Sequence, residues 1–195
     1  MSQSIAISTV WNRDLIASSV LRKVLGVGLF VLLTSLGAFV RIPLPWTPVP
    51  ITLQTFFVVL SGLILGGTLG IVSEVSYLAI GALGLPLFAG ALGGLAVLAG
   101  PTGGYLMAFP IAAWVVGRIG CREKTSWLRA FVALIAGTIV IYLLGVSQLT
   151  FVLHTSWAKG FQLGALPFLP GDALKIVAAL GVYQGWQTRM GRLFR

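Results

Sequence analysis

Six long runs of apolar residues, interrupted by short irregular or basic segments, make up most of this sequence. Hydrophobic residues account for 57% of the chain and charged residues for 9%, and the mean hydropathy is +1.01. A soluble domain carries about 25% charged residues, and a helix that crosses a bilayer needs about 20 mostly apolar residues. The pattern therefore predicts an all-α membrane protein with six transmembrane helices. The runs cover residues 24–40, 52–65, 69–83, 105–116 (extended back to Gly103), 130–153 and 171–186.

The length of the chain leaves little room outside these helices. Six spans of about 20 residues each use most of the chain, which has 195 residues. We therefore expect one integral membrane domain over residues 1–195, with a cytoplasmic N-terminal segment at 1–21 and a six-helix core at 22–190. The same count excludes a separate soluble catalytic domain.

The basic residues gather in three of the segments outside the apolar runs. Three precede the first run, four lie between the fourth and the fifth, and three follow the sixth: Arg13, Arg22, Lys23, Arg118, Arg122, Lys124, Arg129, Arg189, Arg192 and Arg195. Cytoplasmic loops are enriched in Lys and Arg, so we expect a multi-pass protein of the cell membrane, surrounded by membrane lipid, with both termini cytoplasmic. This distribution also accounts for the net charge of +9, so no nucleic-acid partner is expected.

Two segments on the opposite, outer side are too irregular to be simple loops. Residues 41–54 (RIPLPWTPVPITLQ) contain four prolines between Pro43 and Pro50, and proline breaks helices and lacks a backbone donor. Residues 81–105 are rich in glycine, which lets backbone approach backbone or a ligand closely. Because both segments converge on the start of the sixth helix, we expect them to form a lid over a substrate pocket.

Asp172 and Lys175 lie three residues apart at the start of the sixth apolar run. On a helix this spacing places both side chains on one face, and ionised groups at membrane depth cost several kcal/mol unless they are compensated. Two interpretations stay open. The pair forms a polar site for a small solute, or it is a salt bridge that only joins helices.

The sequence lacks the residue groups that an enzyme or a cofactor site would need. The segment GPTGGY at residues 100–105 has no lysine for a phosphate-binding loop. The chain has one histidine, His154, and one cysteine, Cys121. We therefore expect no enzymatic activity, no cofactor and no metal site. Glu74, inside the third run, is compatible with a cap at a helix break, a protonated side chain or a ligand contact.

Four strings of the sequence resemble the BioY family, the biotin-binding membrane subunits of energy-coupling-factor transporters. They are VPITLQTFFVVLSGLILGG (residues 49–67), YLAIGALGLPLFAG (77–90), GPTGGYLMAF (100–109) and GDALKIVAA (171–179). The strings occur in the family's order and span most of the chain from the first run onward. One such string would be weak evidence, whereas four at matching positions are specific.

The resemblance implies a small protein of six helices that captures biotin with high affinity in an outward-facing site. It also implies partners, a transmembrane coupling protein and two ATPase subunits, because the family's substrate-binding subunit has no energy source of its own. The docking face would use small residues that allow close helix approach. The first run offers Gly26, Gly28, Ser35, Gly37 and Ala38. A carrier for another small carboxylate-bearing vitamin is the alternative.

Biotin has a ureido ring, an apolar ring system and a carboxylate, and the resemblance suggests contacts for each part. The expected residues are Asp172, Lys175, Arg41, Gln54, Tyr77, Phe88 and Glu74. Asp172 would accept from the ureido N–H groups or orient Lys175, and either Lys175 or Arg41 would bind the carboxylate. Gln54 supplies a donor and an acceptor, and Tyr77 and Phe88 supply ring faces.

Three of these residues also have purely structural interpretations. Gln54 could bond to backbone groups freed by the prolines. Phe88 could anchor the chain at the membrane boundary, where aromatic residues are common. Arg41 could extend to the lipid headgroups.

Overall fold

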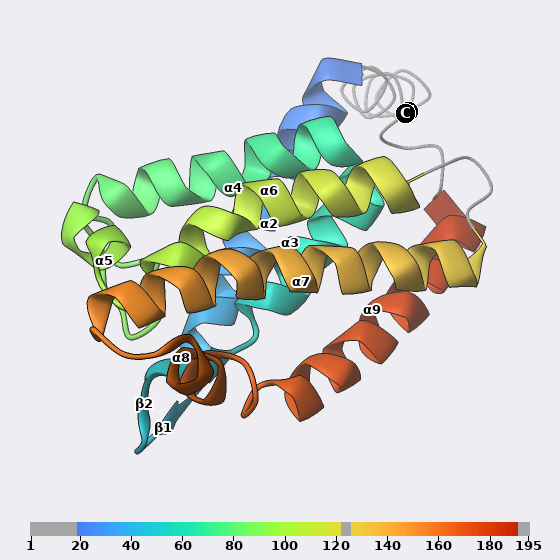
Figure 1. Cartoon of the computed structure of the whole chain (residues 1–195). Coiled ribbons are helices and arrows are strands. Elements are labelled where there is room, and N and C mark those ends of the chain that lie inside the picture. The colour runs from blue at the N-terminus through green and yellow to red at the C-terminus, as the bar shows by residue number, and fades with distance from the viewer. Residues whose placement is uncertain (1–18, 122–125, 191–195) are drawn as a thin grey trace, which may run out of the picture.

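The computed structural model describes residues 19–121 and 126–190, and this part of the chain is mostly helical (Figure 1). The predicted cytoplasmic segment at 1–21 lies largely outside these residues, as do the C-terminal residues 191–195. Among the described residues, six helices contain 12 or more residues, and each overlaps one predicted run. They are α2 (Ser19–Phe39), α3 (Gln54–Leu65), α4 (Gly67–Ala82), α6 (Gly103–Gly120), α7 (Trp127–Val152) and α9 (Leu169–Met190).

By length and composition, fewer helices qualify as membrane spans than the sequence predicts. Within the described residues, α2 and α7 qualify by themselves, and α8 (Trp157–Gly164) with α9 forms a pair bent by 52° that can count as a third span. Helices α3 and α4, with 12 and 16 residues, are apolar but shorter. The membrane character is therefore clear, whereas a crossing by each of the six helices stays a prediction.

Apolar side chains cover the outer surface of the bundle. On α2, Leu25 is 61% exposed, on α7 Leu143 is 63% exposed, and on α9 Leu174 is 73% exposed. Many further Leu, Val and Ile side chains of these helices face outward in the same way. Soluble monomers rarely expose large contiguous apolar patches, so lipid is the medium that fits this surface.

A β-hairpin replaces the purely irregular segment that we expected between the first two helices. Strands β1 (Arg41–Leu44) and β2 (Thr47–Thr52) pair antiparallel, with a register irregularity between Ile42 and Leu44. The description of the fold as all-α is wrong in this detail. A two-stranded sheet tolerates prolines because each strand has a free edge, where a missing N–H breaks no ladder hydrogen bond.

The irregular elements gather at one end of the bundle. Figure 1 shows the β1–β2 hairpin, the short helix α5 (Leu95–Ala99) and α8 at this end. The end of α6 and the start of α7 lie at the other end. The hairpin, α5 and the segment before it correspond to the two segments predicted to form a lid.

Close backbone packing joins α3, α4 and α6. A Cβ atom on Gly62 of α3 would lie 2.9 Å from the Cβ of Val116 on α6, a distance that real side chains essentially never show. A Cβ atom on Gly117 would similarly overlap the backbone at the start of α4, at Gly67. Glycine at these positions lets helices approach closely, as is common in membrane bundles.

The small residues of α2 face mainly into the protein. Gly26, Ser35, Gly37 and Ala38 are buried, and only Gly28 is exposed. The prediction of a docking face made of these residues is therefore wrong for four of the five. Gly37 shows the reason, because a Cβ atom there would lie 3.0 Å from the backbone where β2 leads into α3. The exposed face of α2 carries Leu and Val instead.

Candidate functional site

A cavity of about 370 Å³ lies where the β1–β2 hairpin meets α3, α6, α7 and α9. This volume falls within the usual range of small-molecule pockets, about 300–1,000 Å³. Apolar and aromatic side chains make up much of the wall: Val49, Phe88, Phe109, Ile141 and Phe168. A few polar side chains also face the cavity, and they come from different elements. This mixture suits a ligand with an apolar body and a small number of polar groups.

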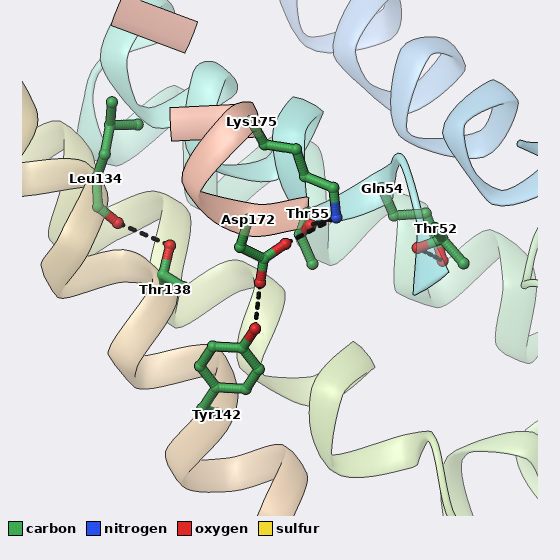
Figure 2. A network of polar contacts seen from close by, with 8 residues as sticks. All are labelled: Thr52, Gln54, Thr55, Leu134, Thr138, Tyr142, Asp172 and Lys175. Atoms are coloured by element: carbon green, nitrogen blue, oxygen red, sulfur yellow. Dashed lines mark hydrogen bonds and ion pairs between the residues drawn. The ribbon is translucent and has the colours of Figure 1, made fainter. Parts of the chain in front are cut away.

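Asp172 and Lys175 form an ion pair in the wall of the cavity (Figure 2). The Lys175 Nζ atom lies 2.8 Å from Asp172 Oδ1 and also donates a hydrogen bond of 2.9 Å to Thr55 Oγ1 on α3. The Tyr142 hydroxyl of α7 donates to the other carboxylate oxygen, Asp172 Oδ2. Asp172 lies in the first turn of α9, where the helix dipole favours a negative charge.

Gln54 connects the cavity wall to the lid and to α4. Its amide nitrogen donates to the Tyr77 hydroxyl, and its amide oxygen accepts from Thr52 Oγ1 at 3.1 Å. The Tyr77 hydroxyl in turn donates to the backbone oxygen of Leu87, next to Phe88. Gln54 is therefore bonded to side chains rather than to backbone groups freed by the prolines. Of the three linked side chains, Thr52 and Gln54 line the cavity.

Arg41 and Phe88 place both parts of the expected lid at the cavity. Phe88 is buried and packs edge to face against Tyr77, with ring centroids 5.6 Å apart. Its backbone pairs with Leu92 around a turn in which Gly90 has a φ of +87°. The guanidinium group of Arg41 faces this turn, because a Cβ atom on Gly90 would meet Arg41 Nη1.

Two of the expected site residues do not line the cavity. Tyr77 and Glu74 are fully buried in α4, behind the wall that Gln54 and Phe88 form. The other five expected residues, Asp172, Lys175, Arg41, Gln54 and Phe88, all line it. Tyr77 contacts two of these, whereas Glu74 accepts a hydrogen bond of 3.4 Å from Thr34 on α2.

A family model decides what kind of protein this site belongs to. The model described as the BioY family matches residues 7–192. The chain belongs to the BioY family. The "Probable biotin transporter BioY" of Pyrococcus horikoshii is 46% identical over 154 residues, which are 79% of this chain and 89% of the relative. The "Biotin transporter BioY" of Thermotoga maritima is 42% identical over 159 residues, 82% of this chain and 92% of the relative.

The fold of this BioY chain matches a solved structure over the whole length of both chains. That structure is described as the crystal structure of the S-component for biotin from an ECF-type ABC transporter, and the TM-score is 0.80. The two sequences are 23% identical, so the match shows a common fold.

Sequence reasoning missed three polar residues at or near the cavity of this BioY protein. Tyr142 and Thr55 line the cavity and complete the hydrogen bonds of Asp172 and Lys175. Gln148 of α7 donates to the backbone oxygens of Leu98 and Gly100, both at 2.8 Å, and so anchors the C-terminal end of α5. A polar side chain inside an apolar run is the signal that could have found them.

Proposed function

We propose that this chain captures biotin at the outer face of the cell membrane, as the substrate-specific subunit of an energy-coupling-factor transporter. Membership of the BioY family supports biotin as the ligand, since relatives of this chain are described as biotin transporters. In this proposal the chain is a transport protein and not an enzyme. The protein needs no cofactor and is embedded in membrane lipid.

The observation that carries the proposal is the environment of Lys175. An ammonium group has three N–H donors, and two of them are engaged by Asp172 and Thr55. The third is available to an acceptor on a ligand in the cavity that Lys175 lines. A positioned cation in a largely apolar cavity fits a ligand such as biotin, which combines apolar rings with a carboxylate and a ureido oxygen.

The contacts of Asp172 favour one of its two expected roles. Lys175 occupies one of its carboxylate oxygens and Tyr142 the other. Asp172 is therefore best suited to orient Lys175, and less suited to accept from the ureido N–H groups. A donor held by two partners loses little freedom when a ligand binds, and such preorganisation increases affinity.

The remaining site residues divide into contacts and supports. Arg41, at the lid, is the second cation available to the biotin carboxylate, and Phe88 supplies a ring face against the bicyclic core. Gln54 supplies a polar contact to biotin from the wall of the cavity. Tyr77 and Glu74, which lie behind this wall, act as supports that fix Gln54 and α4.

We further propose that the six long helices cross the membrane with both termini cytoplasmic, so that the cavity faces outward. The hairpin and the segment around Gly90 then form a lid over bound biotin. Transport then requires a transmembrane coupling protein and two ATPase subunits, the partners that membership of the BioY family implies. The apolar exposed face of α2 is where we place contact with the coupling protein.

Ligand competition on the purified chain tests the assignment of biotin. A fluorescent biotin conjugate bound to the protein should be displaced by biotin and by desthiobiotin, which keeps the ureido ring and the carboxylate. Lipoate and thiamine should not displace it. Displacement by lipoate as efficient as by biotin would instead assign the chain to another carboxylate-bearing ligand.

A further inference from the structure

The interior of the bundle contains a second acidic residue whose surroundings differ from those of Asp172. Glu74 of α4 is 0% exposed and faces α2 and α3. Thr34 Oγ1 donates to Glu74 Oε1 at 3.4 Å. The second carboxyl oxygen, Oε2, is buried without a hydrogen-bond partner in the described part of the chain. One long hydrogen bond is little compensation for a full negative charge in this position.

The hydroxyl groups of three nearby serines add little compensation, because each donates to a backbone oxygen. Ser61 on α3 faces the Glu74 carboxyl group, but its hydroxyl donates to Val58 O at 2.7 Å. Ser73 donates to Val27 O at 3.3 Å, and Ser35 donates to Val31 O at 2.7 Å. The oxygen of Ser61 is left as an acceptor, and an acceptor is satisfied by a protonated carboxyl group, not by a carboxylate.

No cation on the neighbouring helices reaches Glu74 either. Helices α2, α3, α5 and α6 pack against α4, and their charged residues are Arg22, Lys23 and Arg118. Arg22 lies 12 residues from Thr34, about 18 Å along α2, with Lys23 one residue nearer. Arg118 packs beside Gly67, seven residues or about 10 Å from Glu74 along α4. The other titratable side chains of α4 and of these helices are Tyr77 and Tyr105, and a tyrosine carries no positive charge.

We propose that Glu74 is a protonated, uncharged positioning residue that joins α2 to α4 and thereby fixes the wall of the cavity. Tyr77 lies three residues further along α4, on the same face, and accepts from Gln54, which lines the cavity. A shift of α4 relative to α2 would therefore move the Tyr77 hydroxyl and the Gln54 amide with it. The two acids of the bundle thus have different roles: Asp172 pairs with Lys175 and orients it, whereas Glu74 is neutral and positions the cavity wall.

Infrared spectroscopy of the purified protein tests the protonation state without any ligand. The chain has only two glutamates, Glu74 and Glu123, and two aspartates, Asp14 and Asp172. We expect a carbonyl stretch of a protonated carboxyl group that shifts when glutamate is labelled with ¹³C. The band should vanish in Glu74→Gln and persist in the control variant Glu123→Gln. A spectrum of Glu74→Gln identical to that of the unsubstituted protein would overturn the proposal.

A metal ion is the other species that could neutralise Glu74, and buffer exchange distinguishes it from a proton. Replacing sodium by choline should leave the carboxyl band unchanged. A band that appears only after sodium is removed would show that a bound metal ion, not a proton, compensates the carboxylate, and would overturn the proposal.

Biotin binding tests the positioning role, and only this readout rests on the proposed function. Glutamine has the shape of a protonated glutamate, so Glu74→Gln should bind biotin within about threefold of the original affinity. The Glu74→Ala variant loses the Thr34 contact and should bind biotin at least about tenfold more weakly. Loss of binding in Glu74→Gln would contradict a neutral Glu74. If the unsubstituted protein does not bind biotin, the proposed function fails, while the infrared result still decides the state of Glu74.

Discussion

Asp172 positions Lys175 from one helical turn away: the Lys175 ammonium forms an ion pair with Asp172 Oδ1 at 2.8 Å. Both side chains line the cavity and are nearly buried. Tyr142 and Thr55 add one hydrogen bond each, so that two further helices, α7 and α3, hold the two charges of α9 in place. The proposed function requires that this pair serves a ligand and not only the fold.

The Asp172→Asn variant should insert and fold but bind biotin at least about tenfold more weakly, because a hydrogen bond to a charged group is worth about 1.5–3 kcal/mol. Asparagine keeps the size of the side chain but removes the charge that orients Lys175. Titration with biotin, together with size-exclusion chromatography of the variant, measures both properties. A variant that fails to fold would favour a purely structural ion pair.

Removing both charges separates the two interpretations more sharply. Losing one partner of a buried pair costs about 3–5 kcal/mol, whereas replacing both is often neutral. We expect Asp172→Asn combined with Lys175→Met to be more thermally stable than Asp172→Asn alone and still unable to bind biotin. Recovery of biotin binding together with stability would show that the pair is structural.

Tyr142→Phe should weaken biotin binding by about fivefold, since the lost hydrogen bond to Asp172 is worth about 1 kcal/mol when its effect on the ligand is indirect. The matched control is Tyr183→Phe. The Tyr183 hydroxyl donates to Gly120 O, near the end of α6 away from the cavity. An equal loss of affinity in both variants would mean that the Tyr142 contact has no specific role.

Two glycines of the outer segment allow a controlled test of Arg41. Gly90 and Gly94 have φ angles of +87° and +94°, so alanine at either position is strained by about 1–3 kcal/mol. Only at Gly90 would the added Cβ atom meet the Arg41 guanidinium, while at Gly94 it would meet nothing. Both variants should lose thermal stability, but only Gly90→Ala should lose biotin affinity. Equal biotin affinities of the two variants would show that Arg41 does not contribute to the binding site.

Cysteine labelling tests the proposed orientation in the membrane. The single cysteine, Cys121, follows α6, and Trp46 lies at the tip of the hairpin, 60% exposed. A membrane-impermeant maleimide added to intact cells should label Trp46→Cys in a Cys121→Ser background. It should label Cys121 of the original protein only after lysis. The reverse pattern would invert the orientation and place the cavity on the cytoplasmic side.

The number of long helices and the position of the cavity could be predicted because they depend on local patterns. Long runs of apolar residues predict helices, and the prolines between Pro43 and Pro50 predict an extended segment. The hairpin itself was missed, since its pairing of Arg41 with Thr52 depends on register and not on composition. The direction in which the small residues of α2 face was also not predictable, because burial of Gly37 depends on where α3 begins.

The site could be predicted in part for a similar reason. Asp172 and Lys175 stand out because ionised residues are rare in apolar runs, and their spacing shows that they share a face. Their partners Tyr142 and Thr55 come from residues 30 and 120 positions away, and no local pattern links such distant residues. Tyr77 and Glu74 were expected at the ligand, yet they lie behind the wall, since polarity alone does not reveal which face of α4 meets the cavity.

The most direct test of the account is a biotin titration of the detergent-purified chain and its Lys175→Ala variant, followed by tryptophan fluorescence. The control is Lys159→Ala, which removes a lysine of α8 that is exposed and outside the cavity. We predict saturable, tight binding of biotin by the original protein and by Lys159→Ala. The Lys175→Ala variant should bind biotin at least about 100-fold more weakly, because losing a hydrogen bond to a charged group costs about 3 kcal/mol. Unchanged affinity in folded Lys175→Ala would contradict the central role of Lys175.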